Sequence, residues 1–155
     1  YHFLVRPLEN DSLQKFMKKI GAGYSNYFNL KYKRSGALFE SRYKYVSVDN
    51  DRHLLHLPYY IHANPLKLKF PLWREKGLSS KTDEAIKCLK DYRWSSFLSY
   101  TGGNSFSSIV DRDFLLNLYG DEKANREENF KSYYKSFEQW LHDHEDISYL
   151  MEELK

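Results

Sequence analysis

Apolar residues recur at helical spacing near the start of the chain, in residues 11–28. The spacing i, i+3, i+4 and i+7 is typical of a helix that buries one face. Asp11 opens the stretch, and with Gln14 three positions later it makes the pattern of a capping box. We therefore predict a helix whose apolar face belongs to the core. That face comprises Leu13, Phe16, Met17, Ile20, Tyr24, Tyr27 and Phe28.

A second helical pattern follows in residues 51–65, and here the polar face carries reactive groups. The polar face comprises His53, His56, Tyr60 and Asn64, and the neighbouring apolar stripe comprises Leu54, Leu57 and Ile61. Asn50 or Asp49 can cap the start of this helix. Asn64 ends it, because the residue before a proline is pushed out of the helical region. The sequence thus predicts a helix that holds reactive side chains along one side.

Two segments that flank the first helix have the pattern of strands. Residues 1–6 form a short, mostly apolar segment closed by Pro7, and residues 37–48 alternate aromatic with charged side chains. A basic turn at residues 31–36 joins the helix to the second segment. We therefore expect two strands before the helix that carries Tyr60.

The second half of the chain has helical patterns with plain apolar faces. Residues 66–82 keep no sustained period and contain a proline and a glycine, so we expect a long connection there. Short helices are predicted at residues 83–90 and 111–119, the latter ended by Gly120. Two further helices are predicted from apolar spacing, one carrying Phe130, Tyr133, Phe137 and Trp140 and the last carrying Ile147, Leu150, Met151 and Leu154.

Composition places the chain among single-domain proteins with an unusual supply of aromatic rings. The 155 residues are enough for one domain with a real core. Aromatic residues make up 17%, including 14 Tyr and 10 Phe. Rings in such numbers either pack a core or form a surface on which nucleic-acid bases stack, and packing is the commoner use.

Charge is distributed unevenly between the two halves of the chain. Residues 1–80 carry 14 Lys and Arg against 6 Asp and Glu, whereas residues 81–155 carry 10 against 15. We therefore expect only the first half to meet a polyanion. Cys88 has no second cysteine to pair with, which excludes an internal disulfide and fits a reducing compartment. No apolar run approaches the ~20 residues that span a bilayer, so we expect no membrane association and a cytoplasmic location.

Tyrosine chemistry on the second helix needs help from neighbouring groups. A phenol with a pKa near ~10 is a poor nucleophile at neutral pH unless its charge is stabilised or its target is activated. A divalent cation one helical turn away can polarise a phosphodiester in this way. Asn64 offers a carbonyl oxygen four residues after Tyr60, and His2 offers an imidazole. Mixed nitrogen and oxygen ligands suit Mg²⁺ or Mn²⁺.

The segments SGALFESRYKYVSVDNDRHLLHLPYYIHANP and YRWSSFLSY resemble the REP-associated tyrosine transposases and related insertion-sequence transposases of the HUH single-strand nuclease superfamily. The likeness covers roughly residues 1–120, with its pieces in the family's order. It implies an α+β fold, a ferredoxin-like antiparallel sheet with packed helices. Residues 1–105 would form part of the catalytic domain, with N-terminal strands missing before Tyr1, and residues 106–155 a helical C-terminal extension packed on it.

The resemblance also implies a reaction and its residues. Tyr60 would be the nucleophile that attacks single-stranded DNA and forms a 5′-phosphotyrosine link, and His2 and Asn64 would ligate Mg²⁺ or Mn²⁺. The partner would be single-stranded or hairpin DNA in a bacterial nucleoid, and a homodimer is expected as one arrangement. DNA phosphates would be neutralised by Lys18, Lys19, Lys33, Arg34, Arg42 and Lys44.

Three departures from the family pattern are visible. The first histidine of its His-hydrophobic-His motif would precede Tyr1, so we expect that the start of the native protein is missing. Pro58 lies two residues before Tyr60 and removes a backbone donor, which predicts a kink there. The connection from Pro65 to Asp91 is longer than expected.

Alternative readings stay open for these residues. Tyr59 is adjacent to Tyr60, and a rotated helix would present it instead. His2 is equally typical of a structural histidine, Asn64 of a helix stop, and the lysines of a solvated face. His53, His56 and His62 are a second candidate for metal binding, but their spacing does not put all three on one face of a helix, which favours solvated or capping roles. At the level of function, a module that binds single-stranded nucleic acid without cutting it is the runner-up, and a helical interaction protein with an acidic working surface is the third.

Overall fold

The computed structural model of the chain describes residues 1–103, 108–121 and 123–143. Contacts divide the chain into two compact units, residues 1–47 and a second that begins at Val48. The two units are referred to below as unit 1 and unit 2. The predicted domain boundary at residue 105 lies outside the described residues.

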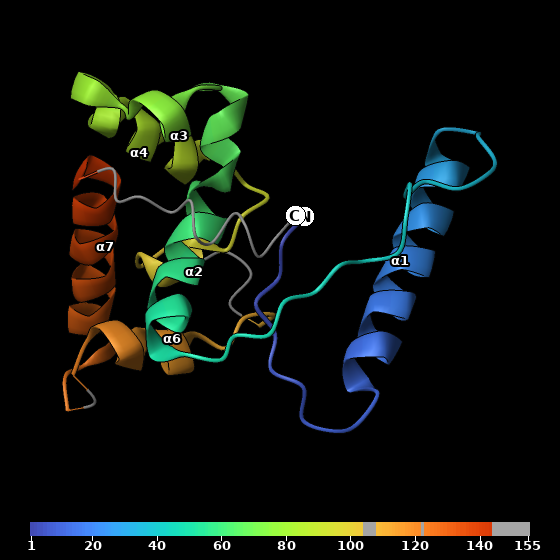
Figure 1. The fold of residues 1–155 in the computed structure, drawn as a ribbon, viewed down its shortest axis with the longest axis horizontal. Coiled ribbons are helices and arrows are strands. Elements are labelled where there is room, and N and C mark those ends of the chain that lie inside the picture. The colour runs from blue at the N-terminus through green and yellow to red at the C-terminus, as the bar shows by residue number, and fades with distance from the viewer. Residues whose placement is uncertain (104–107, 122, 144–155) are drawn as a thin grey trace. The chain divides into compact units, whose positions relative to one another are not determined.

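Unit 1 is built around one long helix, α1, which spans Ser12–Lys31 (Figure 1). The helix was predicted, but its first turn differs from a capping box. Asp11 stands at the N-cap in a left-handed conformation, with φ 62°, and its side chain makes no capping hydrogen bond. The chain turns back after the helix, where the backbone N–H of Arg34 donates to the carbonyl of Asn29 at 3.0 Å.

The apolar face of α1 contacts the extended segments on either side of it. The Tyr24 ring lies 6.2 Å from that of Phe39, and the Phe16 ring lies 5.8 Å from that of Phe3. Even so, no residue of α1 is buried. The prediction that this face belongs to the core was therefore wrong, because the few side chains that cover it are themselves exposed or half-exposed.

The ferredoxin-like antiparallel sheet, and with it the α+β class, is contradicted. No residue of the described part of the chain is in a β-strand, and the elements there are all helical. Residues 1–6 and 37–48, where strands were predicted, are irregular. Alternation of side chains favours a strand only where neighbours supply a ladder of hydrogen bonds, and two short strands alone are marginal in water. The chain supplies only these two candidates.

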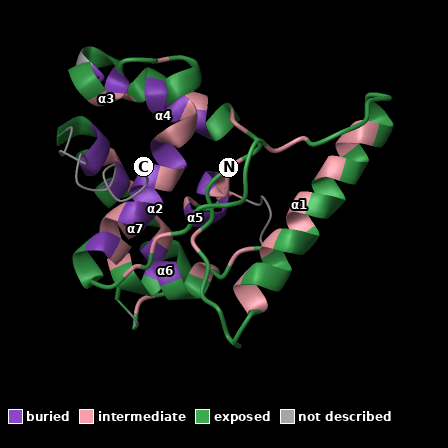
Figure 2. Ribbon diagram, turned by 45° about the vertical axis from the view of Figure 1, so that its right-hand side comes forward, coloured by how far each residue is buried: buried purple, intermediate pink, exposed green. Residues whose placement is uncertain are grey.

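Unit 2 is a cluster of helices packed about α7. Its elements are α2 (Asp51–Ala63), η1 (Asn64–Leu68), α3 (Trp73–Lys76), η2 (Ser79–Lys81), α4 (Thr82–Asp91), α5 (Phe97–Tyr100), α6 (Arg112–Tyr119) and α7 (Arg126–Asp143). Helix α7 packs against α2, α4, α5 and α6. Buried residues are concentrated on the faces these helices turn toward one another (Figure 2).

Several sequence-based helix boundaries in unit 2 are confirmed. Asn50 caps α2, since its Oδ1 accepts a 2.7 Å hydrogen bond from the backbone N–H of His53. Asp111 caps α6 in the same way, and Gly120 follows the end of that helix. The predicted long connection at 66–82 was wrong, because short helices occupy much of it. The last predicted helix, near residues 147–154, lies outside the described residues.

Among residues 1–103, 108–121 and 123–143, no helix is both long and apolar enough to cross a membrane.

Candidate functional site

Tyr60 lies in the last turns of α2 and is almost fully buried, with 3% of its surface exposed. The guanidinium of Arg74 covers its ring, with the guanidinium carbon 4.6 Å from the ring centre. Pro58 lies inside α2, yet the helix continues to Ala63. The proline is therefore accommodated within the helix that presents Tyr60.

Asn64 is the residue directly after α2, and its side chain meets the same arginine. Its Oδ1 accepts a 2.9 Å hydrogen bond from Nη2 of Arg74. The spacing of four residues brings Tyr60 and Asn64 onto one side of the chain, as a helical turn requires. One guanidinium thus contacts both residues that the sequence singled out. We refer to Tyr60, Asn64 and Arg74 as the tyrosine cluster.

Arg74 reaches this cluster from α3, a helix of one turn that sequence analysis missed. Its neighbour Trp73 is buried and packs edge-on against Trp140 of α7, with ring centres 6.4 Å apart. The Arg74 guanidinium also lies 5.4 Å from the Trp73 ring. One sequence signal marks the end of this helix, which is the glycine at position 77. The backbone there has a φ of 69°, a conformation that favours glycine.

Tyr59 is part of the core on the other side of α2. Its ring lies 4.9 Å from that of Tyr119 and 5.5 Å from that of Tyr133. The rings of Phe137 and Trp140 complete its surroundings at 5.8 and 5.6 Å. Rings in these tilted arrangements pack favourably, so the surroundings of Tyr59 explain it as a core residue.

His62 is a buried structural histidine. Its Nδ1 lies 2.6 Å from the Tyr133 hydroxyl, and its Nε2 lies 2.8 Å from the Ser96 hydroxyl. Burial lowers the pKa of His62 to about 3, so the imidazole is neutral at ordinary pH. A neutral imidazole offers one donor and one acceptor, and the two hydroxyls satisfy both. The ring nitrogens of His62 are therefore engaged within the core.

Two tyrosines beside His62 also have their pKa values shifted by burial. Burial raises the pKa of Tyr133 well above its ordinary value. Burial raises the pKa of Tyr100 to about 12, and its hydroxyl donates to the carbonyl of Asp111 at 3.2 Å. Both hydroxyls therefore stay protonated and take part in hydrogen bonds, that of Tyr133 with His62 and that of Tyr100 as donor to Asp111.

The two predicted metal ligands belong to different units, and their joint binding of a metal ion stays a prediction. His2 is exposed and belongs to unit 1, whereas Asn64 belongs to unit 2. The Asn64 oxygen already accepts from the Arg74 guanidinium, and a metal ion bound there would face that positive charge. Within the described residues, no three His, Cys, Asp or Glu side chains are placed to hold a metal ion together.

The predicted DNA-binding residues all belong to unit 1, and all are exposed. They are Lys18, Lys19, Lys33, Arg34, Arg42 and Lys44. Residues 1–47 carry nine Lys and Arg against three Asp and Glu. The six cations are therefore on a strongly basic unit, as attraction to a polyanion requires.

Sequence analysis missed a group of rings and cations in unit 1. Lys31, near the end of α1, lies 5.5 Å from the ring centre of Tyr27 and 5.4 Å from that of Tyr32. A hydrogen bond to the Tyr27 hydroxyl raises the pKa of Lys31. Arg34 lies 5.7 Å from the ring centre of Phe28. We call Tyr27, Phe28, Lys31, Tyr32 and Arg34 the aromatic-basic patch.

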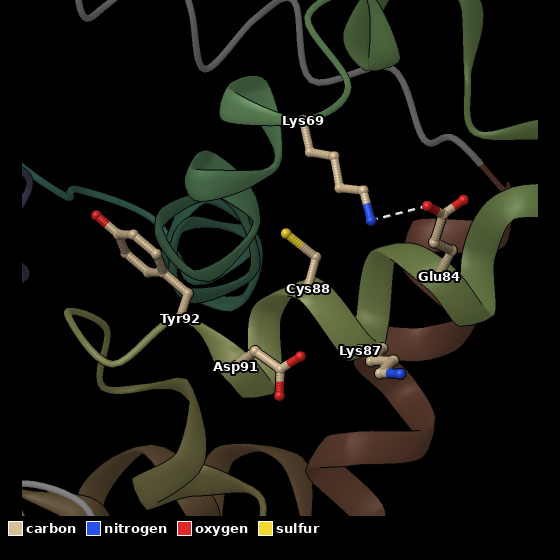
Figure 3. Close-up of a pocket in the computed structure, with 6 residues that line it drawn as sticks. All are labelled: Lys69, Glu84, Lys87, Cys88, Asp91 and Tyr92. Carbon is tan, nitrogen blue, oxygen red and sulfur yellow. Dashed lines mark ion pairs between the residues drawn. The ribbon is translucent and has the colours of Figure 1, made fainter.

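A shallow hollow of about 420 Å³ lies along α4, apart from the residues predicted for catalysis (Figure 3). Its lining is Lys69, Glu84, Lys87, Cys88, Asp91 and Tyr92. Lys69 and Glu84 form a 2.8 Å ion pair across it, which raises the pKa of Lys69 and lowers that of Glu84. Both partners are about half exposed, so solvent screening makes this pair a weak contributor to stability.

Comparison of the chain with protein-family models, with curated proteins and with solved structures found no match.

Proposed function

We propose that this protein nicks and rejoins single-stranded DNA through Tyr60. The observation that carries the proposal is the tyrosine cluster, in which Tyr60 and Asn64 share one guanidinium contact. The order of sequence motifs shared with the tyrosine transposases supports it. A phenol beside a cation is a suitable nucleophile for a phosphodiester, because the cation stabilises the charge that develops during attack.

The proposed reaction balances without a nucleotide cofactor. The Tyr60 Oη forms a bond to phosphorus while the bond from phosphorus to the 3′ oxygen breaks. The phenol loses its proton to solvent, and the departing 3′ oxygen takes one up as a hydroxyl. Attack of a 3′ hydroxyl on the phosphotyrosine reverses these steps and rejoins the strand, since the ester keeps the energy of the original bond.

A covalent adduct assay tests this function. Purified protein is incubated with labelled single-stranded DNA from the flanks of its own gene, with Mg²⁺, with Mn²⁺ or with a chelator, and is analysed on a denaturing gel. We expect a protein-DNA band that persists under denaturation and is absent from Tyr60→Phe. Tyr59→Phe is the matched control, because the adjacent tyrosine packs in the core and should leave the band in place. The chelator lane tests the predicted need for a metal.

Binding of single-stranded nucleic acid without cleavage is the second candidate. Two observations favour it: only 3% of the Tyr60 surface is exposed, whereas Tyr27 in the aromatic-basic patch is 54% exposed. Exposed rings next to cations bind single strands by stacking on bases and neutralising phosphates.

A binding titration separates this candidate from the first. Fluorescence anisotropy with a labelled oligonucleotide should give an affinity that falls with salt. Tyr27→Ala should weaken binding by about 1–3 kcal/mol if one base stacks on this ring. Tyr134→Ala removes a tyrosine that contacts Lys90 on unit 2, and it should leave binding unchanged. Binding without any covalent band would favour the non-cutting module.

A further inference from the structure

We propose that Arg74 binds the DNA phosphate that Tyr60 attacks, exchanging its hydrogen bond to Asn64 for bonds to the phosphate. This inference rests on the proposed function of Tyr60. It assigns contact with the substrate to Arg74 of α3, within residues 66–82, which were predicted to form a connection.

The Arg74 guanidinium lies beside the ring of the proposed nucleophile, Tyr60. The Arg74 guanidinium carbon lies 4.6 Å from the centre of the Tyr60 ring, against its face. A phosphodiester that reaches the hydroxyl of Tyr60 must approach the edge of this same ring. An arginine side chain is long and has several rotatable bonds, so a small shift of its head group suffices to meet the phosphate.

The guanidinium of Arg74 has the donor geometry that suits a phosphate. Its planar fork of N–H donors matches two oxygens of a phosphate, which is why arginine recurs where phosphates are bound. In the present arrangement one of those donors bonds a neutral amide oxygen, that of Asn64. A phosphate oxygen adds the attraction of a negative charge, which the neutral amide oxygen of Asn64 lacks, so exchange toward the phosphate is favourable.

Packing of the neighbouring residue, Trp73, holds the backbone beside Arg74 in place. Trp73 is 4% exposed and packs on Trp140, so the backbone next to Arg74 is fixed on α7. Arg74 itself is only partly buried. A fixed backbone beneath a side chain that is only partly buried suits a preorganised phosphate ligand, because little reorganisation is required at the moment of reaction. Asn64 then holds the guanidinium in place until DNA arrives.

The step that Arg74 would assist is the in-line attack already described. Negative charge spreads over the non-bridging oxygens of phosphorus as the Tyr60 bond forms and the 3′ oxygen leaves. A bidentate guanidinium stabilises this charge more in the transition state than in the ground state, which accelerates the reaction. Arg74 gains and loses no proton in this step.

The test measures the single-turnover rate of adduct formation for Arg74→Ala and Arg74→Lys. We expect Arg74→Ala to slow the reaction by about 10²–10³-fold, the usual effect of removing one donor to a developing oxyanion, with DNA affinity changed much less. Free guanidinium at millimolar concentration should restore part of the Arg74→Ala rate. Arg74→Lys should stay slow, because lysine keeps the charge but loses the fork. Restoration by guanidinium separates a role in the reaction from a role in folding.

Arg93→Ala is the matched control, since Arg93 also stacks on an aromatic ring, that of Trp94, at 4.4 Å. It should react at the wild-type rate. A wild-type adduct whose rate is unaffected by Arg74→Ala would overturn the inference and leave the proposed function standing.

A second readout covers the case in which the wild type forms no adduct. The ¹⁵N resonance of the Arg74 guanidinium is followed while a single-stranded oligonucleotide is added. A shift that requires the oligonucleotide would support phosphate binding by Arg74 although the proposed cleavage had failed. No adduct together with no shift would overturn both.

Discussion

Acid should destabilise unit 2 through one buried side chain, His62. Its imidazole lies between the hydroxyls of Tyr133 and Ser96, and its pKa falls from 6.5 to about 3 because burial penalises the charged form. Above pH 6.5 the ring is neutral in both the folded and the unfolded chain. Between pH 6.5 and about 3 the unfolded chain takes up a proton that the folded chain refuses. Stability that is present at neutral pH is therefore lost as the pH falls through this window.

The size of the loss follows from the two pKa values. Each unit of pH below the unfolded pKa costs up to about 1.4 kcal/mol, so near pH 4.5 the His62 contribution is a loss of roughly 2.7 kcal/mol relative to pH 7.5. Carboxylates also begin to titrate near pH 4.5, which adds a background common to any variant. The prediction therefore concerns the difference between wild type and a variant that lacks the histidine.

The assay is urea unfolding followed by circular dichroism at the two pH values. His62→Gln keeps hydrogen-bonding groups but cannot take up a proton in this range, so its free energy of unfolding should fall by roughly 2.7 kcal/mol less than that of wild type between pH 7.5 and 4.5. His142→Gln changes an exposed histidine near the end of α7 and should behave like wild type. Equal losses in wild type and His62→Gln would refute the reasoning, because they would mean that folded His62 accepts the proton.

Three further predictions concern packing and caps. Gly120→Ala should lower the free energy of unfolding by roughly 1–3 kcal/mol in urea, because the added Cβ would lie 1.9 Å from Oδ1 of Asn129 and force that side chain to move. Gly21→Ala should instead stabilise α1 by about 0.5–1 kcal/mol in a thermal melt, since its Cβ meets nothing within 4 Å, and a loss of stability would contradict the helix at this position. Asn50→Ala should cost roughly 0.5–2 kcal/mol by removing the bond to the His53 N–H, and Asn50→Asp should restore most of it.

The helices that sequence analysis placed correctly are those whose signals are local. Asp111 and Gly120 bracket α6 as a cap and a stop, and Asn50 caps α2. Helix α7 follows the predicted apolar spacing of Tyr133, Phe137 and Trp140, which are buried. These signals depend on residues within a few positions, so they can be read without knowing how the rest of the chain folds.

Predictions that depended on distant partners were wrong in unit 1. The alternation in residues 37–48 favours a strand only if other strands accept its hydrogen bonds, and the described chain supplies none. The apolar face of α1 has helical spacing, but spacing does not say how many side chains will cover it. Tyr24 and Tyr27 are accordingly about half exposed on a helix that was predicted to face a core.

The contact of Arg74 with Asn64 shows why the candidate site could be predicted only in part. Tyr60 and Asn64 are four residues apart on one turn, and their proximity follows from helical geometry alone. Arg74, ten residues after Asn64, contacts these two side chains because Trp73 is buried against α7. That burial depends on a helix more than fifty residues away in sequence. A short helix without a repeating apolar pattern gives no sequence signal for such a return. The Asn64 oxygen, which was predicted to bind a metal ion, therefore accepts a hydrogen bond from the Arg74 guanidinium. The proposed chemistry depends on the contact between that guanidinium and Tyr60.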